Sequence, residues 1–177
     1  MLLLVMSSNF LVMFFGWELV GLSSYLLISF WSKKPSAAKA GNKAFILNRV
    51  GDFGFLVGLM VILNTFNTFD FYTVLKSASD VPENTVTIIS LFLLLGAFGK
   101  SAQFPLFSWL PDAMEGPTPA SALIHAATMV TAGVFMLVRI SPILQYSKIA
   151  GLVIVLIGLV TALLAAFSAI NQYDLSL

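Results

Sequence analysis

Three ionisable side chains, Glu18, Lys100 and His125, lie within long apolar runs of this sequence. A charge at the centre of a membrane-spanning helix costs roughly 3 kcal/mol on insertion scales, so such residues usually pair or mark a transport path. An acid, a lysine and a histidine, which titrates near neutral pH, are the groups that a proton relay needs. We therefore predict a relay in which Glu18 pairs with Lys100. A static ion pair that joins two helices is the alternative.

The apolar run that ends at Lys100 is followed by Pro105. Proline has no N–H and clashes with the carbonyl four positions earlier, so a helix is predicted to break near Pro105. A charge beside such a break is typical of transport sites, although a lysine at a helix end also reaches the membrane surface by extending its side chain. The loop that follows carries Trp109-Leu-Pro-Asp112, and Asp112 is a candidate for proton entry or coupling.

The composition is that of a membrane protein. Of 177 residues, 59% are hydrophobic and only 10% are charged, with a mean hydropathy of +0.97. Soluble domains carry about 25% charged residues. A net charge of +1 gives no indication of nucleic-acid binding. The absence of cysteine excludes disulfides, thiolate metal sites and iron–sulfur ligation in this chain, and one histidine cannot form a metal site alone.

Five apolar segments approach or exceed the roughly 20 residues that span a bilayer. The predicted fold is an all-α membrane protein. Residues 1–177 are expected to form one membrane-embedded unit with about five transmembrane helices. The predicted spans cover residues 10–31, 44–63, 86–110, 119–138 and 149–170, and the third is interrupted near Pro105. Thr118 as N-cap and Pro119 as first helical residue are expected to begin the fourth span.

The first connection between spans, residues 32–43, is predicted to be a polar loop. It holds a cluster of basic residues, Lys33, Lys34, Lys39 and Lys43. The positive-inside rule places this loop, together with Asp112 and Glu115, on the cytoplasmic side or its mitochondrial equivalent, the matrix. The lysines are also candidates for contact with anionic lipid head groups.

Two features of the second span are interpreted as structural. Arg49 and Asp52 lie three residues apart, a spacing that favours an ion pair along one helix. Gly54 and Gly58 make a face of small residues that is suited to close packing against another helix.

Several long motifs resemble one family. They are Gly99-Lys-Ser-Ala-Gln103, Trp109-Leu-Pro-Asp-Ala-Met-Glu-Gly-Pro-Thr-Pro119, Ser121 through Phe135, Gly16 through Ile28 and Asn48-Arg-Val-Gly-Asp52. These motifs are similar to those of the antiporter-like proton-pumping subunits of respiratory complex I, and the resemblance runs over nearly the whole chain.

The resemblance implies roles for the three ionisable residues. Glu18 and Lys100 would form the ion pair of a proton channel, and His125 would belong to the same hydrophilic axis. Lys100 would alternate between charged and neutral forms, driven by redox energy released elsewhere. In the implied enzyme, a proton-translocating NADH:ubiquinone oxidoreductase, the FMN, iron–sulfur clusters and ubiquinone would belong to other subunits. No cofactor is expected in this chain.

Members of that family are several times longer than this chain, which begins and ends close to apolar sequence. We therefore expect a piece of a larger antiporter-like helical bundle, multi-pass in the mitochondrial inner membrane. The expected partners are other complex I membrane subunits, a polypeptide that completes this subunit, and phospholipids, with cardiolipin as a candidate. Nucleic acid is not an expected partner.

Two alternatives stand beside this interpretation. The large subunit of a multisubunit Na⁺/H⁺ antiporter has the same motifs and transports ions without redox coupling. A membrane scaffold that retains the ion pair only for assembly would not transport protons.

Overall fold

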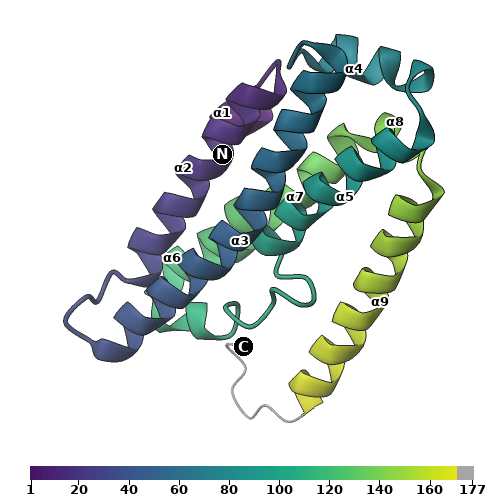
Figure 1. The fold of residues 1–177 in the computed structure, drawn as a ribbon. Coiled ribbons are helices and arrows are strands. Elements are labelled where there is room, and N and C mark those ends of the chain that lie inside the picture. The colour runs from purple at the N-terminus through teal and green to yellow at the C-terminus, as the bar shows by residue number, and fades with distance from the viewer. Residues whose placement is uncertain (171–177) are drawn as a thin grey trace.

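A computed structural model describes residues 1–170, except for the side chains at positions 125 and 126. Figure 1 shows a bundle of helices, and no strand occurs in the described part of the chain. The elements are α1 (Leu2–Val5), α2 (Phe10–Ile28), α3 (Pro35–Phe66), α4 (Phe71–Ser77), η1 (Ala78–Asp80), α5 (Glu83–Lys100), η2 (Asp112–Glu115), α6 (Thr118–Ala122), η3 (Leu123–Thr128), α7 (Met129–Arg139), α8 (Ser141–Leu144) and α9 (Lys148–Ile170). The prediction of an all-α membrane protein is confirmed.

Four of the described helices, α2, α3, α5 and α9, are long and apolar enough to cross a membrane. The fourth predicted span, residues 119–138, is not one regular helix. It consists of α6, the π-helical turn η3 and the apolar helix α7 in succession. Thr118 is the first helical residue there rather than the N-cap, a position that Pro117 takes.

Side chains at the helix ends explain where several elements begin. The Asn9 side chain accepts a hydrogen bond of 2.8 Å from the backbone N–H of Val12 and so caps α2. Asp70 caps α4 in the same way, by accepting from the N–H of Thr73 at 2.9 Å. Such caps satisfy backbone donors that a helix leaves free in its first turn.

Helix α3 begins nine residues before the predicted second span, so the expectation of a polar loop over residues 32–43 is wrong. Pro35 lies in the first turn of α3, where proline favours a helix start because its missing N–H would be unpaired in any case. Lys39 and Lys43 therefore lie on the helix, and the connection from α2 is short.

The centre of the bundle is the contact between α3 and α5. Gly54 and Gly58 face this contact, because a Cβ on them would come within 2.6 Å and 3.2 Å of the Leu95 and Leu93 side chains. A Cβ on Gly51 would lie 3.1 Å from the Cα of Gly99, so the two backbones touch there. The prediction that glycines allow close helix packing is thus confirmed.

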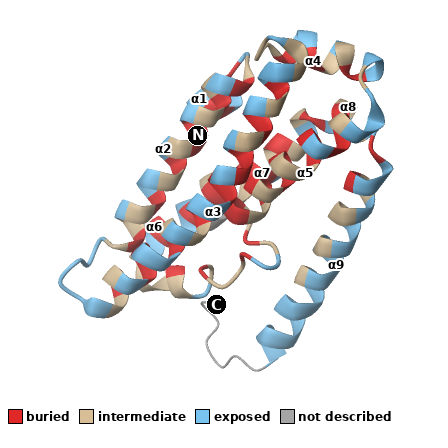
Figure 2. Cartoon of the chain, viewed as in Figure 1, coloured by how far each residue is buried: buried red, intermediate tan, exposed pale blue. Residues whose placement is uncertain are grey.

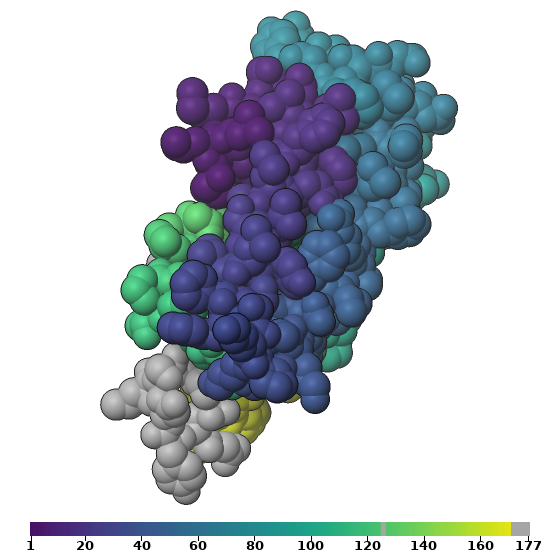
Figure 3. Space-filling view, turned by 90° about the vertical axis from the view of Figure 1, so that its left-hand side faces the viewer, coloured from purple at the N-terminus to yellow at the C-terminus, as the bar shows by residue number. Residues whose placement is uncertain are grey.

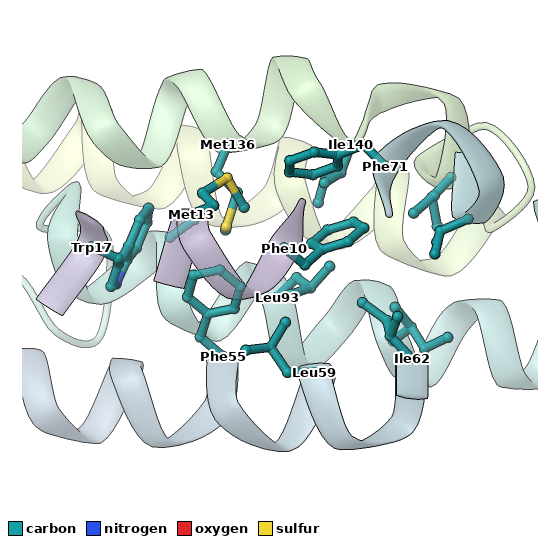
Figure 4. Packing of buried hydrophobic residues seen from close by; sticks show 14 of the residues in the cluster. Phe10, Met13, Trp17, Phe55, Leu59, Ile62, Phe71, Leu93, Met136 and Ile140 are labelled. Carbon is teal, nitrogen blue, oxygen red and sulfur yellow. The ribbon is translucent and has the colours of Figure 1, made fainter. Parts of the chain in front are cut away.

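Apolar side chains of α2, α3, α5 and α7 fill the space around this contact, as Figure 4 shows. The larger members of this core are Phe10, Met13, Trp17, Phe55, Leu59, Leu93 and Met136. Helix α9 is different, because it lies at the edge of the bundle in Figure 1, where it contacts α5 and α8, and most of its residues are exposed in Figure 2. Ala150 is its one buried residue within the described range.

Candidate functional site

Lys100, the last residue of α5, has a side chain that is only 1% exposed. Its ammonium group lies 3.3 Å from Oδ2 of Asp52, a buried carboxylate on α3. The indole N–H of Trp17, on α2, donates to Oδ1 of the same carboxylate at 2.7 Å. Asp52 therefore binds a donor from each of two neighbouring helices, and this arrangement fixes the place of the lysine ammonium.

Gly21 leaves the space that the ammonium group occupies. A Cβ built on Gly21 would lie only 2.5 Å from Nζ of Lys100. The Nζ atom also lies 5.9 Å from the ring centroid of Trp17, one turn earlier on α2. The end of the lysine side chain thus fills a niche between α2 and α3 that any larger residue at position 21 would close.

A second ion pair lies beside the first. Arg49 of α3 donates to Oε2 of Glu18 on α2, and its guanidinium lies 4.9 Å from the ring centroid of Phe45. The Arg49 side chain is 51% exposed and that of Glu18 is 21% exposed. Among the described residues, nothing donates a hydrogen bond to the other carboxylate oxygen of Glu18, Oε1.

The pairing differs from both ion pairs that the sequence predicted. Glu18 binds Arg49 rather than Lys100, and Asp52 binds Lys100 rather than Arg49. Residues three apart on a helix point about 60° away from each other. Asp52 can therefore face α5 while Arg49 faces the exposed side next to α2, and each finds its partner on a neighbouring helix.

The two pairs nevertheless form one electrostatic network. The charges of Asp52, Arg49 and Lys100 all act on Glu18, and the charges of Arg49 and Glu18 act on Lys100. Two acids and two bases are thus held together at the meeting point of α2, α3 and α5. A change in the pairing of one group would therefore change the electrostatic potential at the other three.

The interruption of the third predicted span begins at Ser101, before Pro105. Two hydrogen bonds close α5 in a Schellman motif, from Gln103 N–H to Phe98 C=O at 2.9 Å and from Ala102 N–H to Gly99 C=O at 3.4 Å. Ala102 has the left-handed φ of 50° that this motif requires. No helix follows before η2. Within the predicted span over residues 86–110, the helix therefore ends at Lys100.

The loop after the break returns to the end of α5. Trp109 is fully buried, and its indole N–H donates to the carbonyl of Gly99 at 3.1 Å, directly beside Lys100. The Ser101 hydroxyl donates to the carbonyl of Val130 at 2.7 Å and so joins the break to α7. Polar contacts from both sides therefore hold the end of α5 in place.

Asp112 and Glu115 lie where the loop meets the start of α3. Asp112 binds Lys43 at 2.7 Å, and Glu115 binds Lys34 at 2.8 Å and the hydroxyl of Ser36 at 3.1 Å. The hydrogen bond from Lys34 is the main cause that holds the pKa of Glu115 below its usual value. Asp112, a candidate for proton entry, is thus in a surface ion pair of the loop that carries Trp109.

His125 belongs to η3, where the helix widens to a π-helical turn. Its side chain lies outside the described residues, so its predicted place on the hydrophilic axis stays a prediction. Single π-helical turns inside α-helices are frequent at functional sites. In the same turn the Thr128 hydroxyl donates to the carbonyl of Leu123, five residues earlier, at 2.9 Å.

Sequence reasoning missed the roles of Asp52, Trp17, Gly21 and Trp109. One signal was present for Asp52, because it follows Gly51 and precedes Gly54 on the face of α3 that packs against α5. Nothing in the spacing indicated that the Trp109 indole would return to Gly99. No group of three acidic, histidine or cysteine side chains that could hold a metal ion occurs among residues described here.

Comparisons with known proteins place this geometry in a family. A family model described as NADH:quinone oxidoreductase/Mrp antiporter, TM, matches residues 7–176. NADH-ubiquinone oxidoreductase chain 5 of Rhizopus stolonifer is 57% identical over 175 residues. NADH-quinone oxidoreductase subunit L of Neisseria meningitidis serogroup A is 52% identical over 187 residues.

Among solved structures, one of the Mrp complex from Dietzia sp. DQ12-45-1b superimposes with a TM-score of 0.94 at 31% identity. The match covers 99% of this chain and 19% of the Mrp chain. The two curated relatives likewise match 99% of this chain, which spans only 27% and 28% of their lengths. The four-residue network and the helix break thus lie in a region that the relatives share.

Proposed function

Since the chain belongs to the NADH:quinone oxidoreductase/Mrp antiporter transmembrane family, we propose that it forms part of a proton-translocating subunit of an NADH:ubiquinone oxidoreductase. In this proposal the chain carries no redox site. It moves protons through the membrane, while electron transfer in other subunits supplies the energy. The curated relatives in Rhizopus stolonifer and Neisseria meningitidis, which are named as oxidoreductase subunits, support this choice.

The observation that carries the proposal is a lysine ammonium buried at the interrupted end of a spanning helix. Lys100 is paired there with Asp52 in a site that excludes most water. A buried ammonium is stable only while a counter-ion binds it. If the Asp52 carboxylate moves away or binds another cation, Lys100 favours release of its proton. Alternating pairing would thus convert a conformational change into proton transfer at Nζ.

The neighbouring pair supplies a means of changing that contact. Glu18 interacts electrostatically with both Asp52 and Lys100 while it binds Arg49. A change in the Glu18–Arg49 pair would alter the field at Lys100 without breaking a covalent bond or repacking the core. We assign Glu18 this coupling role, His125 the next position along the proton path, and Asp112 a place near its entrance.

The proposed location is the mitochondrial inner membrane, with other complex I membrane subunits and a polypeptide that completes the subunit as partners. Purification of the assembly that contains this chain tests the proposal. We expect it to contain flavin, oxidise NADH and acidify one side of the membrane. An assembly that exchanges Na⁺ for H⁺ without oxidising NADH would contradict the proposal and favour the antiporter alternative, to which the Mrp likeness also points.

A further inference from the structure

A groove of about 330 Å³ lies at the connection between α2 and α3. It is lined by five consecutive residues, Phe30, Trp31, Ser32, Lys33 and Lys34. Phe30 and Trp31 are 61% and 54% exposed, and their rings meet edge to face at 5.2 Å. The groove therefore combines a large exposed aromatic surface with two lysines at its rim.

The charge around the groove is unbalanced toward positive. Lys34 is already paired with Glu115, and Lys43 with Asp112. For Lys33 and Lys39, no carboxylate lies within ion-pair distance in the described part of the chain. The groove thus offers an ammonium group that is free to bind an anion.

The position of the groove places it at a membrane surface. It joins the end of α2 to the start of α3, and both helices are long and apolar enough to span a bilayer. Figure 3 shows the face on which α2 and the first turns of α3 lie, with their connection toward the lower end. Tryptophan at the head-group level with lysine beside it is the usual pattern of a membrane interface.

We propose that this groove binds the head-group phosphate of an anionic phospholipid. The phosphate lies on Lys33, and the first part of an acyl chain covers Phe30 and Trp31. A lipid fits this surface better than a soluble anion does, because a soluble anion would leave both aromatic rings in water. The proposal depends on membrane placement and on charge, and it is independent of whether Lys100 transfers protons.

Photochemical cross-linking in the complete assembly tests the site. The purified assembly is placed in nanodiscs of phosphatidylcholine that contain a phosphatidylglycerol with a photoreactive head group. Mass spectrometry then measures the labelling of residues 30–34. We expect clear labelling by phosphatidylglycerol and much weaker labelling by a phosphatidylcholine with the same photoreactive group. Equal labelling by the two lipids would overturn the proposal.

Three variants sharpen this test. Lys33→Gln should reduce labelling about fivefold, since a lysine near an anionic surface contributes roughly 1 kcal/mol. Glu115→Gln should raise labelling, because it frees Lys34 and removes a negative charge. The control Lys76→Gln changes an exposed lysine that also lies near an aromatic ring, 5.7 Å from that of Tyr72, but on α4 at the other end of the bundle.

Lys76→Gln should leave labelling of residues 30–34 unchanged. Labelling that is insensitive to Lys33→Gln, or that falls in Glu115→Gln, would contradict the site. Inorganic phosphate, added in excess to the same nanodiscs, distinguishes the two sources of a phosphate group. If phosphate removes the lipid label where chloride of the same ionic strength does not, the groove is a site for soluble phosphate and the lipid proposal is wrong.

Discussion

Replacement of Asp52 by asparagine tests the ion pairing at Lys100. Asp52→Asn keeps the size of the side chain but removes the counter-ion of an ammonium that is 1% exposed. Breaking a buried ion pair by removing one partner costs about 3–5 kcal/mol. Glu18→Gln is the matched comparison, because it leaves Arg49 half-exposed and should cost about 1 kcal/mol or less.

The assay is unfolding of the full-length protein by sodium dodecyl sulfate, followed by circular dichroism. Each variant is also combined with Lys100→Gln in a double-mutant cycle. We expect strong coupling between positions 52 and 100 and weak coupling between 18 and 100. The unfolded chain in detergent also finds polar partners, which lowers all of these energies, so the order of the two couplings is the prediction. A larger coupling of Lys100 to Glu18 would refute the pairing described here.

Three further predictions concern the surroundings of this site. Gly21→Ala should displace the Lys100 ammonium and lower proton pumping by the complex in vesicles, whereas Gly151→Ala, with open space around its Cβ, should leave pumping unchanged. Trp109→Phe removes one of two donors to the buried carbonyl of Gly99, which keeps the N–H of Ala102, and should lower stability by about 0.5–1.5 kcal/mol in denaturant titrations. Backbone hydrogen bonding from Thr73 at the start of α4 lowers the pKa of Asp70. The ionised Asp70 carboxylate therefore stabilises the fold fully above its unfolded-state pKa of about 4. This stabilisation is lost as the pH falls through the lower pKa of the folded state. The protection of α4 amides against hydrogen exchange, relative to the intrinsic exchange rate at each pH, should therefore fall on acidification in the wild type but not in Asp70→Asn.

The course of the chain follows from the sequence where a local signal marks it. Asn9 lies just before the apolar run of α2 and caps it, so the predicted start at Phe10 matches the helix. Pro35 begins α3 for a comparable local reason, but the lysines after it favoured a loop interpretation. Long lysine side chains are compatible with a helix that extends beyond the apolar part of a membrane, which explains the error.

The arrangement at Lys100 required the three-dimensional structure. The rotation of α3 relative to α2 and α5 decides whether Asp52 or Glu18 meets the lysine, and charge spacing does not specify this rotation. The end of α5 was similarly hidden, because its left-handed position holds Ala102 rather than the glycine that usually marks such an end. Pro105 indicated an interruption but not its first residue.

Proton pumping by Lys100→Arg tests most directly whether Lys100 releases its proton during transport. Arginine keeps the positive charge that Asp52 binds but stays protonated in proteins, whereas Lys100→Ala damages both a relay and a static pair. The variant complex is first shown to be fully assembled and is then reconstituted into vesicles, where a pH-sensitive dye reports pumping during NADH oxidation. We predict that pumping and the quinone reduction coupled to it fall sharply. Near-normal pumping with arginine at position 100 would contradict a deprotonating lysine and leave a structural ion pair.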